Sequence, residues 1–150
     1  MVSGALGQGR KIMKIAIIAM FLLAGLVLTP AMAWDISTYS LTVRIENIHA
    51  GRGHLMIGVF NDENDFPNNH FVGKRIATID ETMTVVFHDL PVGQYAVSVF
   101  QDSNNNGRLD TNIFGIPREK FGFSNGVRRS DFHASLFGFD GDTSITIRIR

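Results

Sequence analysis

Hydrophobic and polar residues alternate with a period of two along much of the chain after residue 40. Leu41, Val43 and Ile45 are separated by single polar residues, and Ile145 and Ile147 belong to a similar series near the C-terminus. Such alternation is typical of a strand with one buried and one exposed face. With turn residues between the runs, the pattern predicts strands at residues 41–46, 55–60, 75–79, 83–88, 95–100, 132–139 and 143–149.

The fold class follows from these short strands. Residues 34–150 contain no segment of ten or more residues with apolar positions at helical spacing. We therefore expect an all-β protein, a single antiparallel Greek-key β-sandwich (Ig-like or transthyretin-like) of about seven strands. Residues 102–129 are the exception, because this long irregular stretch still contains apolar residues. Loops of that length in a compact domain are usually functional, held by an ion or disordered, and the apolar residues of this one argue against disorder.

The start of the chain has the pattern of a secretory signal peptide. Arg10, Lys11 and Lys14 precede an uncharged apolar run over residues 15–28, and a small-x-small site ends at Ala33. The run has 14 residues, whereas a spanning helix needs roughly 18–20. An uncleaved membrane anchor and a buried core helix are the alternatives.

The predicted domain division is therefore a signal-peptide helix over residues 1–33 and a β-sandwich over residues 34–150. Cleavage would leave Trp34 as the first residue, with no stable membrane span in the mature chain. Lys14 directly after Met13 also resembles an initiation site, so residues 1–12 can be an extension of the true start. The expected location is the periplasm or the secreted fraction.

Charge and cysteine content exclude several classes of function. The chain has 14 Lys+Arg and 14 Asp+Glu, and removing the three basic leader residues leaves 11 against 14, a net charge of −3. A nucleic-acid partner is not expected, because such proteins usually carry a basic stripe. The absence of Cys excludes disulfides, thiolate zinc sites and Cys nucleophiles.

The most specific local motif is a candidate calcium loop. Oxygen side chains stand at relative positions 1, 3, 5 and 9, in Asp102, Asn104, Asn106 and Asp110, with glycine at position 6. Arg108 at position 7 would contribute its backbone carbonyl. Position 12 is an isoleucine in place of the usual bidentate Glu, so we expect a weak site with a Kd of about 0.1–1 mM. An Asn-Gly turn flanked by Asx caps, without an ion, is the alternative.

Catalytic signals are weaker. The five histidines form no HxH or HxxxH pair, and no G-x-S-x-G motif occurs. Ser124, Asp131 and His133 supply the residue types of a hydrolytic triad, but scattered residues of these types are common in proteins of this size. The sequence therefore predicts no catalytic residue.

An aromatic and glycine-rich segment, residues 121–126, is a second candidate site. Aromatic faces beside polar amides can form a shallow platform for a carbohydrate or a peptide. The alternative is that these Phe side chains plug the end of the sandwich beneath the long loop.

Two segments carry a family resemblance. Residues 89–97, Asp-Leu-Pro-Val-Gly-Gln-Tyr-Ala-Val, resemble the hairpin entry of transthyretin-like and adhesin B-type sandwiches. Together with residues 99–112, 115–119 and 122–125, they are similar to an uncharacterised family of exported bacterial proteins, domain of unknown function 2141. The resemblance implies an exported single-domain sandwich and no activity. The acidic loop resembles the calcium loops of adhesin B-type repeats, which often add a downstream Glu, and here the nearest is Glu119.

The function we expect from sequence is a non-enzymatic extracytoplasmic β-sandwich module of unknown ligand, stabilised by Ca²⁺ in the Asp/Asn loop. Its expected partner is an envelope protein or a glycan. The alternatives are a small periplasmic hydrolase with its site around residues 102–129, and a purely structural envelope protein.

Overall fold

The computed structural model describes residues 37–150, so the predicted signal peptide lies outside the described residues. These residues form eight strands, one short α-helix and one 3₁₀ turn. The strands are β1 (Thr38–Glu46), β2 (His54–Phe60), β3 (Val72–Ala77), β4 (Thr82–Pro91), β5 (Gly93–Asp102), β6 (Phe121–Phe123), β7 (Phe137–Phe139) and β8 (Thr143–Arg148). The 3₁₀ turn η1 (Ser124–Gly126) and the helix α2 (Phe132–Ser135) lie between β6 and β7.

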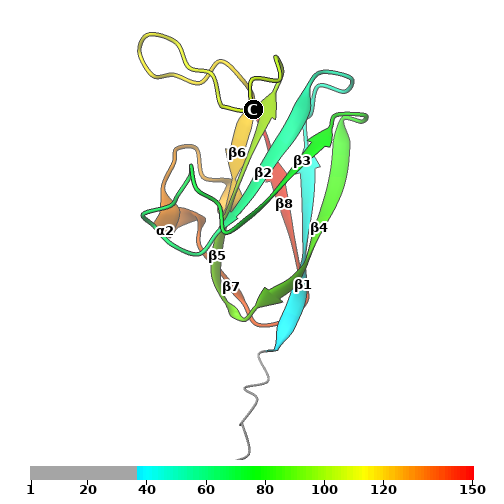
Figure 1. The fold of residues 1–150 in the computed structure, drawn as a ribbon, viewed down its shortest axis with the longest axis vertical. Helices are drawn as coiled ribbons and strands as arrows, with labels where there is room; N and C mark the ends of the chain where they lie inside the picture. Colours follow the sequence, from blue (N-terminus) through cyan, green and yellow to red (C-terminus); the bar gives the residue numbers. More distant parts are fainter. Residues whose placement is uncertain (1–36) are drawn as a thin grey trace, which may run out of the picture. The chain divides into compact units, whose positions relative to one another are not determined.

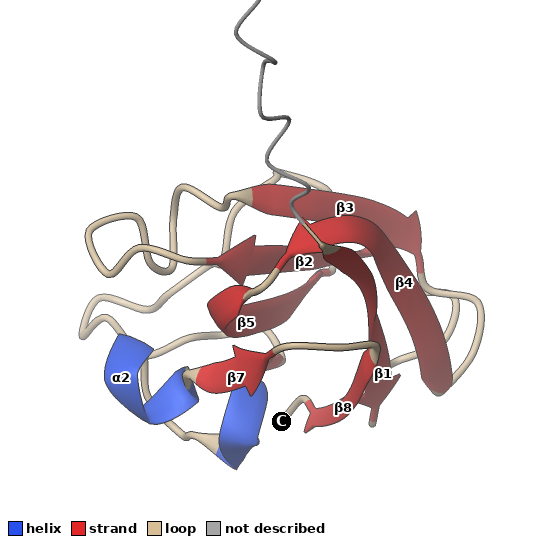
Figure 2. Cartoon of the chain, turned by 90° about the horizontal axis from the view of Figure 1, so that it is seen from below, coloured by secondary structure: helices blue, strands red, loops and turns tan. Residues whose placement is uncertain are grey.

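The strands form two facing sheets (Figures 1 and 2). The first sheet has the order β4-β1-β8, and the second has the order β3-β2-β5-β6, with β7 also pairing with β5. The chain passes from one sheet to the other after β1, β3, β4 and β7. The predicted all-β sandwich is confirmed.

The core lies between the two sheets and consists of the residues that alternation marks as inward. Leu41, Val43 and Ile45 of β1 are each 0% exposed. They face apolar residues of the second sheet, and all of these belong to one buried cluster. Burial of one such side chain contributes about 1.5–3 kcal/mol, so the alternating strands provide the main driving force for folding.

Two details of the predicted fold are wrong. The sandwich is not wholly antiparallel, because β8 pairs in parallel with β1. Residues 132–139 are not one strand, because α2 occupies the first four of them. Asp131 caps this helix, since its carboxylate accepts the N–H of Ala134 at 2.9 Å, and only Phe137–Phe139 remain to pair with β5.

The two ends of the sandwich carry different connections. β2, β3 and β5 bring His54, Ala77 and Asp102 to the same end by their register. The long connection from β5 to β6 therefore leaves the sandwich beside the β1–β2 and β3–β4 turns, at the top of Figure 1. The tight β4–β5 turn at Val92 lies at the opposite end.

Candidate functional site

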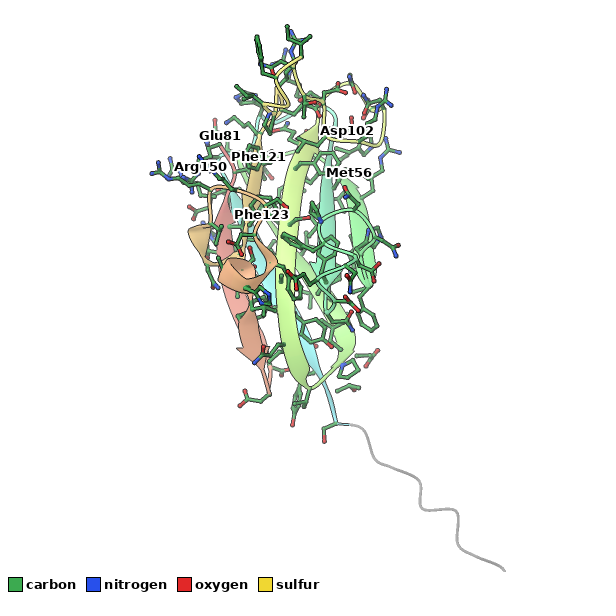
Figure 3. The ribbon with its side chains drawn as sticks, turned by 90° about the vertical axis from the view of Figure 1, so that its left-hand side faces the viewer. Met56, Glu81, Asp102, Phe121, Phe123 and Arg150 are labelled. Carbon is green, nitrogen blue, oxygen red and sulfur yellow. The ribbon has the colours of Figure 1, made fainter. Side chains whose placement is uncertain are left out.

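A row of three half-buried side chains and one exposed arginine crosses the outer face of the second sheet. The strand register aligns Arg75, Met56, Phe100 and Phe121 from β3 to β6. The residues directly before and after them in each strand face the core, so these four side chains point away from it. Figure 3 looks toward this side of the molecule and labels Met56, Phe121 and Phe123.

The neighbouring row is covered by the loop between β2 and β3. This row contains Gly73, Gly58, Ser98 and Phe123. A Cβ atom on either glycine would collide with the His70 ring or with Phe60, so the loop lies directly on the sheet. Small residues thus leave room for the loop.

An aromatic cluster fixes that loop on the sheet. The ring centroids of Phe60 and Phe66 are 5.1 Å apart. The Phe66 centroid is also 5.6 Å from those of Phe123 and Phe132. Phe121 and Phe123 therefore lie on the outer face of β6 and do not fill the space between the sheets, which corrects the interpretation of these residues as a plug.

Two adjoining hollows of about 300 and 250 Å³ lie between this loop and the Asp/Asn loop. We call them together the outer groove. Met56 and Phe121 each line one hollow, and Phe100 lines both. Pro67 and Asn68 from one loop and Gly107 from the other are also common to both.

The charged residues lining the outer groove are all basic. Lys74 and Arg75 line the first hollow and Arg108 lines the second, and neither hollow is lined by Asp or Glu. The Lys74 ammonium is engaged elsewhere, because its Nζ donates to the Val86 carbonyl at 2.6 Å. Arg75 and Arg108 have no carboxylate within 4.0 Å among residues 37–150.

The Asp/Asn loop, which forms one wall of the groove, starts from a buried carboxylate. Asp102 is 0% exposed. Its Oδ1 accepts the N–H of Asn106 at 3.0 Å, and its Oδ2 accepts the N–H of Gly107 at 2.8 Å. Hydrogen bonds to an ionised acceptor are stronger than neutral ones. The end of β5 therefore fixes the glycine that lines both hollows.

The other predicted ligand side chains contact one another around the loop. Asp110 accepts the Asn104 amide at 2.7 Å and the Asn106 amide at 2.9 Å. The side-chain oxygens of both Asn residues accept N–H groups two residues further on. Arg108 takes part through its N–H, which donates to Asn106 at 3.0 Å.

Glu119 closes the base of the same loop. Its two oxygens accept the N–H of Ser103 at 2.8 Å and the N–H of Asp110 at 3.1 Å. The carboxylate therefore joins the two ends of a segment that leaves β5 and returns toward β6.

This donor set has the chemistry of a calcium site. Ca²⁺ takes six to eight oxygen ligands from carboxylates, amides, carbonyls and water. Asp102, Asn104, Asn106 and Asp110 supply such oxygens within one connected network. Among residues 37–150, no three His, Asp or Glu side chains converge on one point, so the amide oxygens are needed to complete a site.

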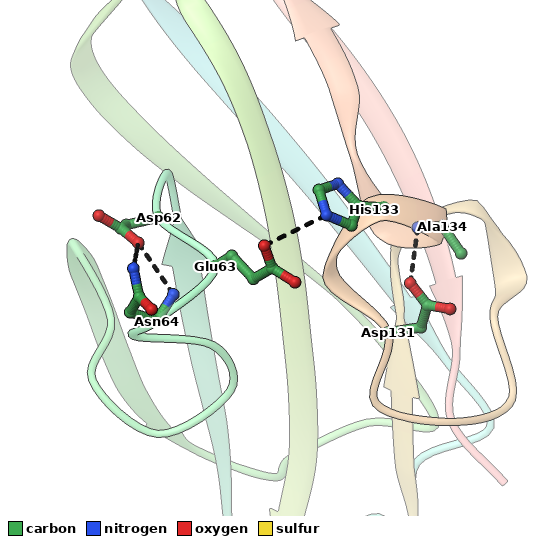
Figure 4. A network of polar contacts seen from close by, with 6 residues as sticks. All are labelled: Asp62, Glu63, Asn64, Asp131, His133 and Ala134. Carbon is green, nitrogen blue, oxygen red and sulfur yellow. Dashed lines mark hydrogen bonds and ion pairs between the residues drawn. The ribbon is translucent and has the colours of Figure 1, made fainter.

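The residue types of the hydrolytic triad are not brought together. Ser124 is 1% exposed, and its hydroxyl donates to the Ser135 carbonyl at 2.6 Å. His133 pairs with Glu63 at 3.2 Å on the surface, and Asp131 caps α2 (Figure 4). These contacts are structural and do not form a nucleophile–base pair.

The comparisons with known proteins identify a family. Residues 43–147 match the family described as "Uncharacterized protein conserved in bacteria (DUF2141)". The chain belongs to the DUF2141 family. Neither a search of curated proteins nor a search of solved structures finds a match for this DUF2141 chain. Its likeness to transthyretin-like and adhesin B-type sandwiches stays a prediction.

Sequence reasoning found the Asp/Asn loop of this DUF2141 protein and the Phe121 segment but missed the groove that joins them. The groove floor comes from β2, β5 and β6, and Arg75 comes from β3. Only the pairing register aligns these residues, and no spacing along the chain encodes it. The sequence signal for the groove was the presence of two large apolar residues, Met56 and Phe100, at positions of their strands that face outward.

No helix within residues 37–150 is long and apolar enough to cross a bilayer.

Proposed function

We propose that this protein is an exported, non-enzymatic binding module whose outer groove takes an acidic glycan. The observation that carries the proposal is the lining of the two adjoining hollows, which combines aromatic floor residues with guanidinium groups that pair with no carboxylate among residues 37–150. The Asp/Asn loop lines one side of that groove through Gly107 and Arg108, and Ca²⁺ holds the loop in the conformation that binds the glycan.

The groove floor suits the apolar face of a sugar ring. Phe100 and Phe121 are half-buried neighbours in adjacent strands, so their rings are held by the sheet while part of each stays accessible. Binding sites of this kind combine apolar and aromatic walls with a few polar groups that orient the ligand. Asn68 and Ser98 supply such polar groups beside the rings.

The charge of the lining favours an acidic sugar over a neutral one. Arg75 and Arg108 present planar donors that match a carboxylate or phosphate in two-point geometry. Neither has an acidic partner to displace, so an anionic ligand forms its ion pairs without breaking existing ones.

Calcium binding would act on the same wall. Asp102, Asn104, Asn106 and Asp110 would hold the ion, with the backbone carbonyl of Arg108 as a fifth ligand. The two Asn amides would rotate so that their oxygens replace the nitrogens now directed at Asp110. Since Gly107 and Arg108 line the groove, glycan and Ca²⁺ should each raise the affinity for the other by the same factor.

The glycan is tested with a panel of oligosaccharides of matched length, either neutral or containing uronic acid. Calorimetry should detect binding of the acidic members, and Phe100→Ala or Arg75→Ala should weaken it by about tenfold or more. Arg44→Ala is the matched control, because Arg44 lies on β1 in the other sheet and pairs with Glu46. Equal binding of neutral and acidic sugars, or no binding at all, contradicts the proposal.

The calcium component is tested by thermal melting with 1 mM Ca²⁺ and with chelator. A site with a Kd of about 0.1 mM stabilises the fold by about 1.4 kcal/mol at this concentration. Asp102→Ala should melt at the same temperature in both buffers, and Asp142→Ala, remote in sequence, should keep the wild-type response. Identical wild-type midpoints in both buffers would refute calcium binding.

Export is tested separately by mass spectrometry of the periplasmic and secreted fractions. We expect Trp34 at the amino terminus of the mature protein. An intact chain starting at Met1 or Met13 in the membrane fraction would support the anchor alternative.

A further inference from the structure

The tip of the long β5–β6 connection exposes three large apolar side chains. Ile113 is 93% exposed, Phe114 80% and Ile116 58%. The other large apolar residues exposed within residues 37–150, namely Phe71, Ile79 and Val92, come from separate connections. Isolated exposed apolar residues are ordinary, but three within four positions mark an interaction site.

This tip has a defined conformation. The side-chain oxygen of Asn112 accepts the N–H of Phe114 at 2.9 Å and the N–H of Ile116 at 3.0 Å. The Asn112 carbonyl accepts the N–H of Gly115 at 2.9 Å, and the Asn112 N–H donates to the Ile116 carbonyl at 2.8 Å. A β-bridge between Thr111 and Pro117 closes the base. The apolar side chains are therefore held outward by a small closed turn.

The hydrogen bonding of the turn lowers the cost of moving it out of water. An N–H group without a partner costs several kcal/mol in hydrocarbon. At this tip, the N–H groups of Phe114, Gly115 and Ile116 all have acceptors within the turn. The exposed side chains can thus enter an apolar phase while these backbone donors stay satisfied.

Two arginines lie near the base of the tip. Arg52 and Arg118 line one polar hollow together with Asp110 and Glu119. The two carboxylates already accept hydrogen bonds from the loop. Neither guanidinium has a carboxylate within 4.0 Å among the described residues. Of the four charged residues that line this hollow, only the two arginines therefore have side chains without a hydrogen-bond partner within residues 37–150, and these are the groups free to meet a ligand there.

We propose that the tip formed by Ile113, Phe114 and Ile116 inserts into the interfacial region of a membrane that contains anionic lipids. The apolar side chains enter the headgroup–acyl boundary, and Arg52 and Arg118 contact lipid phosphates. An apolar protein pocket would also accept the side chains, but the unpaired guanidinium groups behind the tip match a layer of phosphates. This proposal is independent of the glycan groove, which none of these five residues lines.

Insertion is tested with a single tryptophan placed at the tip of the full chain. Trp34 is the only natural tryptophan, so Trp34→Phe combined with Phe114→Trp gives one reporter. On vesicles of phosphatidylcholine and phosphatidylglycerol with brominated acyl chains, the reporter should shift to shorter wavelength and be quenched. Trp34→Phe with Val92→Trp is the matched control, because Val92 is 53% exposed at the opposite end of the sandwich. No quenching at position 114, or equal quenching at position 92, overturns the proposal.

Vesicle partitioning separates the apolar from the electrostatic contribution. Phe114→Ser should lower the partition coefficient of the full chain on anionic vesicles by about tenfold. Arg52→Gln and Arg118→Gln should each lower it by about fivefold, and the difference from wild type should shrink at high salt. The apolar leader can bind vesicles by itself, so its contribution is measured with the triple variant Phe114→Ser, Arg52→Gln and Arg118→Gln and is subtracted from every partition coefficient. Unchanged partitioning of Phe114→Ser, or equal binding of wild type to purely zwitterionic vesicles, refutes anionic membrane insertion and leaves a protein pocket as the occupant.

Discussion

Gln101 is a buried polar residue that joins the first turn of the sandwich to the strand that leads into the Asp/Asn loop. Its side-chain nitrogen donates to the carbonyls of His49 at 2.8 Å and Arg52 at 2.7 Å. Its side-chain oxygen accepts the N–H of His49 at 2.9 Å, and the residue is 1% exposed. Gln101→Glu keeps the shape but directs a carboxylate oxygen at two carbonyls.

The loss of stability caused by Gln101→Glu has an upper limit, because the new carboxylate can bind a proton instead of staying charged in the core. A Glu with an ordinary pKa of about 4.3 can be protonated at pH 7 for about 3.7 kcal/mol, since each pH unit corresponds to 1.36 kcal/mol. The protonated group donates to one carbonyl and leaves the other without its partner, which adds about 1 kcal/mol. We therefore expect a destabilisation of at most about 5 kcal/mol at pH 7 and about 2 kcal/mol at pH 5.

Urea denaturation at both pH values measures this difference. Burial raises the pKa of the introduced carboxyl in the folded state. The free energy of unfolding of the Gln101→Glu variant is therefore highest below pH 4.3 and decreases as the pH rises above that value. Gln101→Leu is the matched control, because it removes the same hydrogen bonds without a titratable group, and its cost relative to wild type should not change between pH 5 and 7. A destabilisation by Gln101→Glu that is equal at the two pH values would refute the role assigned to the amide.

Three further predictions concern the turn, the sheet packing and the loop tip. Burial raises the pKa of Tyr95 above its usual 10.0, so the contribution of Tyr95 to the free energy of unfolding should be fully present below about pH 10 and decrease above it. Tyr95→Phe should reduce that alkaline loss and, by losing the bond to the Pro91 carbonyl, cost about 1 kcal/mol at neutral pH in urea denaturation. Gly122→Ala would place a Cβ 2.9 Å from Ile147 Cγ2 and should cost about 1–3 kcal/mol. Gly138→Ala, with no atom within 4 Å, should cost far less, and equal losses in the two variants would contradict the packing argument. Asn112→Ala should speed hydrogen exchange at the Phe114 and Ile116 amides by about tenfold, with little change in Tm. Unchanged exchange would show that the side chain does not hold the turn.

The sequence predicts the residues buried between the two sheets better than the segments outside that core. Alternation depends on burial of one strand face, and it identified Leu41 and Ile147 as inward residues. The short strand β6 was missed because its three residues are too few to show a period. At residues 132–139 the alternating apolar residues indicated a strand, whereas the capping of Ala134 by Asp131 selects a helix.

The candidate site also has a part that the sequence reveals and a part that it does not. The Asp/Asn loop is local, so the spacing of Asp102 and Asp110 reveals it. The contribution of Glu119 depends on a chain reversal that brings it to Ser103, and spacing alone gave no reason to place it there. The groove is a product of register among β3, β2, β5 and β6, which a one-dimensional pattern does not contain.

The parallel pairing of β1 with β8 also sets the order in which the chain can fold. β1 is the central strand of its sheet, and one of its two partners is formed by Thr143–Arg148 at the far end of the sequence. The Asn47 side chain, which donates to the Ile149 carbonyl at 2.7 Å, closes the same distance of 102 residues along the chain. A chain that emerges from its amino end therefore lacks one edge of this sheet until Thr143–Arg148 appear. Contacts between such distant segments slow folding, so the sandwich closes only after the segment that forms β8 has been synthesised.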